Sequence, residues 1–211
     1  MKRYFRIMLG KSSVFAADAR AGGYVGVDWF ADVDLSKRLP DNWKDFNKEF
    51  IPTYLAENPG KSKVAAGLSC GFTWTVAKGI KLGDMVLSPN GKGQYYVGEV
   101  ISDYYYASGE PMPHRRKVAW QPDLIERSLM SQELKRATGA IGTSSEVSQY
   151  ASEIEHLMSA GGMAISSQPD EIEDEIVFAL ESQLKEFLVA NWANTELGKK
   201  YDIYEDEGIL M

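Results

Sequence analysis

Apolar and polar residues follow a strand-like pattern most clearly between Ile80 and Trp120, which predicts three strands joined by marked turns. An apolar run covers 85–88, a turn rich in Pro, Asn and Gly follows at 89–93, and β-branched and aromatic residues resume at 94–106. Two prolines at 111 and 113 lack the N–H that a strand donates, so we expect them to break the ladder. A third strand is expected at 115–120. The stretch therefore predicts a hairpin followed by one more strand.

Upstream of this hairpin the pattern predicts alternating strands and helices. Strands are expected at 4–9 and 24–30, and a short helix at 14–20 with Ser12 or Ser13 as its N-cap. Trp43 to Leu55 is amphipathic after Asn42, and we expect most of its apolar stripe to be core: Trp43, Phe46, Phe50, Ile51 and Tyr54. A helix of small residues is expected at 62–70, whereas periodicity leaves 72–78 open between helical and extended.

After Trp120 the pattern turns helical. Short helical turns are expected at 123–127 and 131–136, and a longer helix from Ser144 to about 158. Gly and Ser are frequent at 159–168, which is typical of a linker, and a further amphipathic helix is expected from Pro169 to about Trp192. These elements together predict an α+β fold with a helical C-terminal segment.

Composition narrows the class of protein. The 211 residues are 44% hydrophobic and 25% charged, as in ordinary soluble globular proteins, and no run of eighteen apolar residues predicts a membrane span. The N-terminus alternates cations with aromatic residues instead of forming an apolar signal segment. Cys70 is the single cysteine, so no disulfide can form within the chain. We therefore expect a cytoplasmic protein with no membrane partner.

Charge is distributed unevenly along the chain. Residues 1–140 hold 20 Lys and Arg against 15 Asp and Glu, whereas residues 141–211 hold 3 against 15. A mildly basic first part can meet a polyanion through a local patch although the net charge of the whole chain is −7. The alternative interpretation of the acidic part is a solvated tail without a binding role.

The stretch from Ile80 to Trp120 also resembles a known protein family. Gly83-Asp84 before a strand, then Tyr-x-Val-Gly-Glu-Val at 95–100 and His-Arg-Arg-Lys-Val-x-Trp at 114–120, resembles the EVE-type modules of the PUA superfamily. Those modules are small β-barrels that read modified bases in nucleic acids. The resemblance covers residues 1–140 and implies an EVE-like, PUA-type barrel with flanking helices.

A protein that reads one altered base must take it out of the stack, hold it between aromatic faces and hydrogen-bond its edge. We expect an acid and aromatic residues to form this base pocket: Asp28, Trp29, Phe30, Trp74, Tyr104, Tyr106 and Trp120. Contacts to the nucleic-acid backbone are expected from the run that follows the tyrosines: His114, Arg115, Arg116 and Lys117. The alternatives are that the aromatic residues fill the barrel and that the cations keep a strand edge soluble.

The C-terminal residues carry a second resemblance. Leu180-Glu181-x-x-Leu184-Lys185-Glu186-Phe187-Leu188, with Asn191-Trp192 and Tyr201-Asp202-Ile203-Tyr204 after it, resembles the opening helix and first strand of a restriction-endonuclease-like domain. We therefore expect a helical appendage at 141–158, a linker at 159–168 and an incomplete nuclease domain at 169–211. A complete nuclease would use a divalent metal such as magnesium. The catalytic and metal-binding positions of the family are missing from these residues, so we expect that this chain alone does not cut DNA.

No metal site is expected in the chain itself. The two histidines, His114 and His156, and the lone cysteine do not supply the three or four ligands that a zinc site needs. The predicted function is recognition of DNA bearing a modified base, by base flipping, as the specificity module of a modification-dependent restriction endonuclease. Two alternatives stay open: an RNA-binding module of the PUA type, and a protein-interaction scaffold that dimerises through the C-terminal helices. The sequence does not specify the modification.

Overall fold

The computed structural model describes residues 2–140, 142–159, 205–206 and 209–210, and the chain divides into two units, Met1–Ile165 and Ser166–Met211. In the second unit the described residues form a small hairpin of β8 (Glu205–Asp206) and β9 (Ile209–Leu210). The linker expected from residue 160 onward and the helix expected at 169–192 lie outside the described residues.

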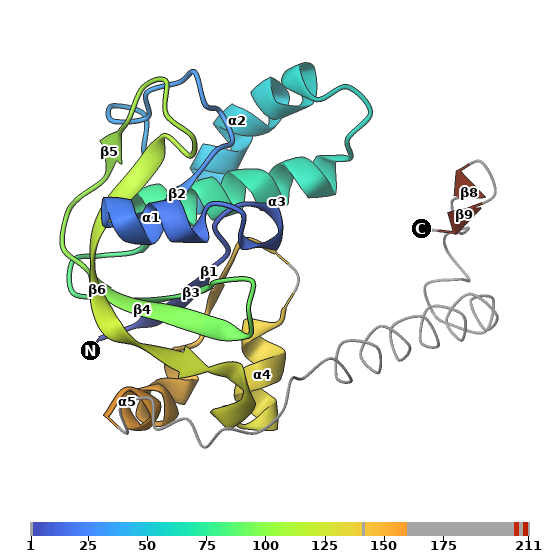
Figure 1. Ribbon diagram of the computed structural model, residues 1–211. Coiled ribbons are helices and arrows are strands. Elements are labelled where there is room, and N and C mark those ends of the chain that lie inside the picture. The colour runs from blue at the N-terminus through green and yellow to red at the C-terminus, as the bar shows by residue number, and fades with distance from the viewer. Residues whose placement is uncertain (1, 141, 160–204, 207–208, 211) are drawn as a thin grey trace. The chain divides into compact units, whose positions relative to one another are not determined.

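The first unit is built on one curled sheet of seven strands (Figure 1). The strands are β1 (Tyr4–Ile7), β2 (Tyr24–Val27), β3 (Met85–Pro89), β4 (Gln94–Val100), β5 (Tyr105–Tyr106), β6 (His114–Glu126) and β7 (Ser144–Glu146). Their order is β2-β6-β4-β3-β1-β7, with β5 also on β6. Among the described strands, only β1 and β3 pair in parallel. The long β6 curves across the sheet, so the described strands form a half-barrel with free edges at β2 and β7.

Helices and short turns connect and cover these strands. The α-helices are α1 (Ala16–Gly22), α2 (Trp43–Glu57), α3 (Lys63–Trp74), α4 (Gln132–Thr138) and α5 (Ala151–Ser159). A π-helical turn, η2 (Thr75–Gly79), extends α3, and 3₁₀ turns lie at Lys11–Ser13, Arg127–Leu129 and Ser148–Tyr150. The predicted α+β class is therefore confirmed.

Local sequence signals set several helix starts as expected. The Asn42 side chain accepts a hydrogen bond from the Lys44 N–H, and the Ser62 hydroxyl accepts one from the Ala65 N–H, so both act as N-caps. The expected cap of the first helix is wrong, because α1 begins after Phe15 and no side chain caps it.

Three hydrophobic clusters stabilise the first unit. Phe5, Ile7 and Val86 on one face of the sheet pack with α1, and Tyr4, Met85 and Leu87 on the other face pack with α4 and α5. This division follows the two-residue period of the strands. The third cluster lies in the α2 and α3 pair and is centred on buried aromatic rings: Phe30, Phe46, Phe50 and Tyr54.

Two segments expected to be helical are strands. Residues 123–126 continue β6, because Leu124, Ile125 and Glu126 pair with the first residues of β4. Residues 144–146 form β7 beside β1, and the helix expected from Ser144 begins at Ala151 instead. Segment 141–158 thus contributes an edge strand to the sheet as well as a helix. The undecided stretch 72–78 is helical, first as α3 and then as η2.

Candidate functional site

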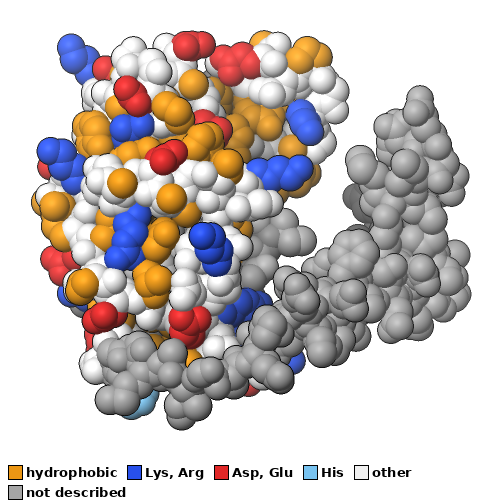
Figure 2. Space-filling model, viewed as in Figure 1, with side chains coloured by type: hydrophobic (Ala, Val, Ile, Leu, Met, Phe, Trp, Pro, Cys, Tyr) orange, Lys and Arg blue, Asp and Glu red, His pale blue; other side chains and the backbone are white. Residues whose placement is uncertain are grey.

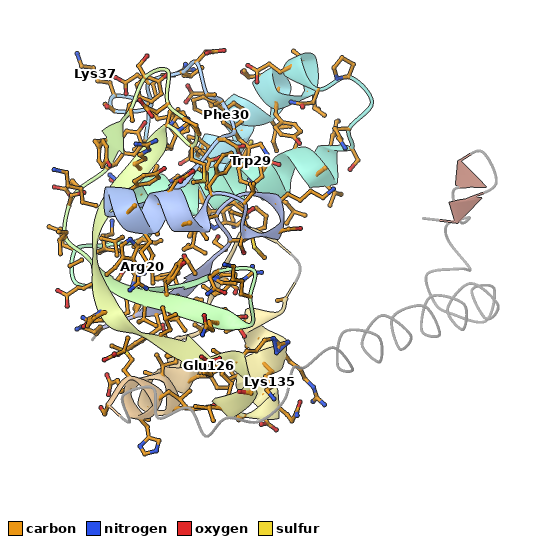
Figure 3. All side chains as sticks on the ribbon, viewed as in Figure 1. Arg20, Trp29, Phe30, Lys37, Glu126 and Lys135 are labelled. Carbon is orange, nitrogen blue, oxygen red and sulfur yellow. The ribbon has the colours of Figure 1, made fainter. Side chains whose placement is uncertain are left out.

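The predicted pocket residues gather around the loop that follows β2. Asp28 is exposed, Trp29 is half-buried and Phe30 is buried with φ of 60°. A bulky residue rarely adopts this left-handed conformation, so the surroundings must hold it in place. Figure 3 shows Trp29 and Phe30 beside the α2 and α3 pair, and the Trp29 ring lies 6.0 Å from that of Phe72 in α3.

A buried histidine anchors this loop. His114 is fully buried, and its Nε2 lies 3.1 Å from the Phe30 carbonyl oxygen while its Nδ1 lies 2.9 Å from the Tyr104 hydroxyl. A carbonyl only accepts, so Nε2 carries the proton and Nδ1 accepts from Tyr104. The Tyr104 hydroxyl in turn accepts from the Leu35 N–H at 3.3 Å. A neutral His114 therefore satisfies every hydrogen bond of this network.

Burial and neighbouring charges act in opposite directions on this imidazole. Desolvation lowers the pKa of His114, and bonds to backbone carbonyls and the nearby Asp34 and Asp28 only partly oppose it. The Tyr106 ring lies 5.6 Å from that of His114, and the Tyr106 hydroxyl donates to the Ala31 carbonyl at 2.6 Å. Both tyrosines and His114 therefore serve to hold the 28–35 loop.

The expected nucleic-acid contacts of the His-Arg-Arg-Lys run are only partly at the surface. Arg116 is 4% exposed and donates to the carbonyls of Val76, Ala77 and Ser102, so it joins β6 to the end of η2. His114 is buried as described. The structure places both side chains in the interior instead, and neither reaches the solvent, where a phosphate could bind.

Arg115 and Lys117, the sequence neighbours of Arg116, are less buried than Arg116. The guanidinium of Arg115 lies 3.8 Å from the centroid of the Tyr24 ring and donates to the carbonyls of Pro111 and Met112. Lys117 is exposed. Of the four cations or donors predicted for the DNA backbone, Lys117 alone has an exposed and uncommitted side chain within the described part of the chain.

Trp120 lies apart from the other predicted pocket residues. Its ring packs edge-on against Tyr96 at 6.1 Å, and its Nε1 donates to the Ala19 carbonyl at 3.2 Å. It belongs to the cluster between the sheet and α1. The structure therefore brings Trp29, Phe30 and Trp74 into one region and leaves Trp120 outside it.

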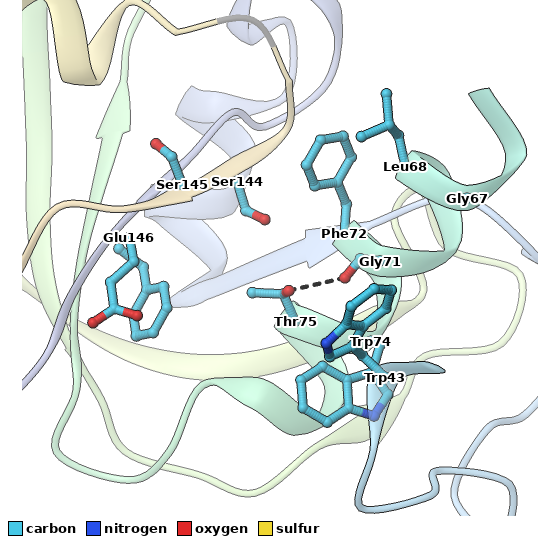
Figure 4. Close-up of a pocket in the computed structure, with 11 residues that line it drawn as sticks. Trp43, Gly67, Leu68, Gly71, Phe72, Trp74, Thr75, Ser144, Ser145 and Glu146 are labelled. Carbon is cyan, nitrogen blue, oxygen red and sulfur yellow. Dashed lines mark hydrogen bonds between the residues drawn. The ribbon is translucent and has the colours of Figure 1, made fainter. Parts of the chain in front are cut away.

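A cavity of about 370 Å³ opens between α3 and the free edge of the sheet (Figure 4). Its apolar wall comes from α3 and from the first residue of α2: Trp43, Leu68, Phe72 and Trp74. Trp43 is 47% exposed and Leu68 is 55% exposed, so both lie at the rim. The Trp74 Nε1 donates to the Pro40 carbonyl at 2.8 Å, which fixes its ring.

The opposite wall is polar and comes from β7. Ser144, Ser145 and Glu146 line it, together with Phe5 from β1. Ser144 and Glu146 pair with Ile7 and Phe5, so their side chains share the face of the sheet that meets α3. Among the described strands β7 is last in the order, so one edge of its backbone has unpaired N–H and C=O groups. One wall can therefore stack a flat ring while the other hydrogen-bonds its edge.

Trp74 is the one predicted pocket residue that lines this cavity. The amphipathic pattern predicts that Trp43 belongs to the core stripe of its helix, and it leaves Phe72 open between helical and extended structure. Phe46, Phe50 and Tyr54 of the same stripe are indeed buried, whereas Trp43 lies at the cavity rim. The available signal was the position of Trp43 directly after the N-cap, where a side chain lies at the end of the helix and can leave the core.

The face of the first unit that Figure 2 shows has no single dominant charge. Figure 2 shows Lys and Arg interspersed with Asp and Glu, and with apolar side chains between them. Within the described residues no group of three His, Cys, Asp or Glu side chains is placed to hold a metal ion. None of the described helices is long and apolar enough to cross a membrane.

The fold and the cavity define an α+β domain with one aromatic, ligand-sized site between its helical pair and its sheet edge. Residues 5–143 match the model of the family described as "Domain of unknown function (DUF8426)", and the chain belongs to that family. No curated protein matches the chain. The matched range starts at the second residue of β1, takes in β2 to β6 with the α2 and α3 pair, and ends directly before β7.

Proposed function

We propose that the first unit reads DNA by holding one extruded, modified base in the cavity between α3 and β7. In this proposal it is the specificity module of a modification-dependent restriction endonuclease. Strand cutting would belong to the nuclease domain, with a divalent metal such as magnesium, that residues 169–211 resemble. The observation that carries the proposal is the pairing of an aromatic wall with a polar edge in a cavity of about 370 Å³.

The size and chemistry of the cavity suit a single base. Ligand sites generally measure roughly 300–1,000 Å³, so this one accepts a small flat molecule and not a large cofactor. Stacking on an aromatic side chain is worth about 1–3 kcal/mol per base, which is comparable to the few kcal/mol that base extrusion costs. Trp43, Trp74 and Phe72 offer such faces, and Ser144 and Glu146 offer groups for the base edge.

The resemblance to EVE-type modules supports the same interpretation, and the structure changes which residues take part. The pocket residues become Trp43, Phe72 and Trp74, with Trp29 packed behind Phe72. Asp28 and Phe30 belong to the 28–35 loop, which Tyr104 and Tyr106 hold in place, and Trp120 belongs to the cluster between the sheet and α1.

The test is a binding titration of the full chain with one DNA duplex, unmodified or carrying 5-methylcytosine, 5-hydroxymethylcytosine or N6-methyladenine. Trp43→Ala removes a ring that is already 47% exposed, so the variant is expected to fold. Ile101→Ala is the matched control, because Ile101 is 54% exposed and does not line the cavity. We expect Trp43→Ala to weaken binding to the preferred duplex by about 5- to 150-fold, from a stacking loss of about 1–3 kcal/mol.

Other results would point elsewhere. Equal binding to all duplexes, or equal affinity of both variants for the modified one, would overturn the base-reading proposal. Tighter binding of single-stranded RNA than of any duplex would favour the RNA-binding alternative. A dimer that disappears on truncation at residue 160, without nucleic-acid binding, would favour the interaction scaffold.

A further inference from the structure

Two loops of the first unit lie close to each other. The first, Gly10–Ser13, follows β1, and the second, Asn90–Gly93, joins β3 to β4. They approach so closely that a Cβ on Gly91 would lie 3.4 Å from the Ser12 carbonyl oxygen. The Met8 N–H donates to the Thr143 carbonyl at 2.7 Å, so the first loop starts next to the residue that precedes β7.

The backbone of the first loop is held in an unfavourable conformation. Ser12 has φ of 53° and Ser13 has φ of 60°, and Gly10 before them also has a positive φ of 77°. Non-glycine residues rarely adopt this region, and here two of them follow each other. Such strain persists where surrounding structure imposes it, and it gathers at binding sites. Ser12 is exposed, so packing of its own side chain does not explain its conformation.

Each of the two loops also carries one exposed lysine. Lys11 and Lys92 are exposed, and neither forms an ion pair within the described residues. Lys2 and Lys78, by contrast, form ion pairs, with Glu99 and Asp41 respectively. The side chain of Asn90 accepts from the backbone N–H groups of Lys92 and Gln94, which fixes the second turn.

We propose that Lys11 and Lys92 bind phosphates of the same DNA strand whose base enters the cavity. Lys11 is three positions after Met8, so its Cα lies within about 10 Å of that residue, whose N–H bonds the carbonyl of Thr143 directly before β7. One strand advances about 3.4 Å per nucleotide, so this distance reaches phosphates about three nucleotides from the extruded base. The inference rests on the proposed function, and it replaces His114 and Arg116 with residues that are exposed.

The test measures the salt dependence of DNA binding by Lys11→Ala, Lys92→Ala and the double variant. Each lost phosphate contact should reduce the slope of log K against log salt concentration by about 0.9, and the double variant by about 1.8. The preference for the modified duplex should be retained, because phosphate contacts carry no base information. Lys37→Ala is the matched control, because Lys37 is an exposed lysine far from the second loop. Glu126 marks the position of that loop, since its side chain accepts a hydrogen bond from Gln94 directly after it. Figure 3 shows Lys37 and Glu126 at opposite ends of the unit.

The outcomes separate this inference from the proposed function. Unchanged slopes in the Lys11 and Lys92 variants, with modification preference intact, would overturn the inference alone. Reduced slopes without any modification preference would support the phosphate contacts and overturn base reading. Absence of DNA binding by the wild type would overturn both. If millimolar inorganic phosphate displaced DNA at constant ionic strength, the loops would be a free-anion site and the inference would fail.

Discussion

Replacing Arg116 distinguishes an internal from a DNA-contacting role for the His-Arg-Arg-Lys run. The guanidinium donates at 2.8 Å to Val76, 2.7 Å to Ala77 and 3.1 Å to Ser102, in each case to a backbone carbonyl. Two of these carbonyls belong to η2, where a cation also interacts favourably with the end of a helix. Arg116→Ala would leave all three acceptors without this donor.

The magnitude follows from these three bonds. A buried acceptor that loses its partner costs about 1–3 kcal/mol, so three of them amount to roughly 3–6 kcal/mol after some relaxation and entry of water. Domains are stable by only about 5–15 kcal/mol, so Arg116→Ala should remove a large part of the stability. Arg116→Lys should be intermediate or nearly as severe, because a single ammonium cannot reproduce the planar fork.

Urea unfolding followed by tryptophan fluorescence measures this change. With a slope of about 2 kcal/mol per molar urea, the midpoint should fall by roughly 1.5–3 M. Lys117→Ala is the adjacent control on the opposite face of β6, and it should change the stability by less than about 0.5 kcal/mol. An Arg116→Ala protein that is as stable as the Lys117→Ala protein, but binds DNA more weakly, would refute the assignment of Arg116 to the interior.

Two further predictions concern His114 and β4. The folded state lowers the pKa of His114 below its ordinary value of 6.5, so the unfolded chain binds this proton first and stability should fall as the pH drops below about 6.5, by up to about 1.4 kcal/mol per pH unit. Urea titrations from pH 8 to 5 should show a shallower fall for His114→Gln, and an equal fall would contradict the assignment. Gly98→Ala should destabilise the sheet by about 1–3 kcal/mol, because the added Cβ would lie 2.5 Å from a Val118 methyl carbon and 2.9 Å from the Ala119 carbonyl oxygen; an unchanged melting temperature would show that β6 can move away at little cost.

Features with a local cause were predictable from the sequence. The turn at 89–93 between two apolar runs gave the β3–β4 hairpin, and Asn42 before an amphipathic stretch gave the start of α2. In both cases the residues that determine the element lie within the element or directly beside it.

Features that depend on residues far away in the sequence were not predictable. Residues 123–126 are extended because β4 pairs with them, and 144–146 because β1 does, and neither partner is a neighbour in sequence. The same holds for the site. Trp43 lies at a cavity rim because β7 and α3 meet there, and Arg116 is buried because η2 presents carbonyls to it. The residue types show that position 43 is aromatic and position 116 is basic, but they do not predict whether either side chain is exposed.

The position of β1 between β3 and β7 has a consequence for the order of assembly during synthesis. Among the strands of this sheet β1 is translated first, yet its two partners are Met85–Pro89 and Ser144–Glu146. Pairing with the latter closes a loop that spans almost the whole first unit, and such long-range contacts form slowly and late. The cavity wall is thus complete only after most of this unit has been translated. Until then, the apolar side chains of Leu68 and Phe72 on α3 lack the β7 wall, and transiently exposed apolar surface of this kind favours aggregation.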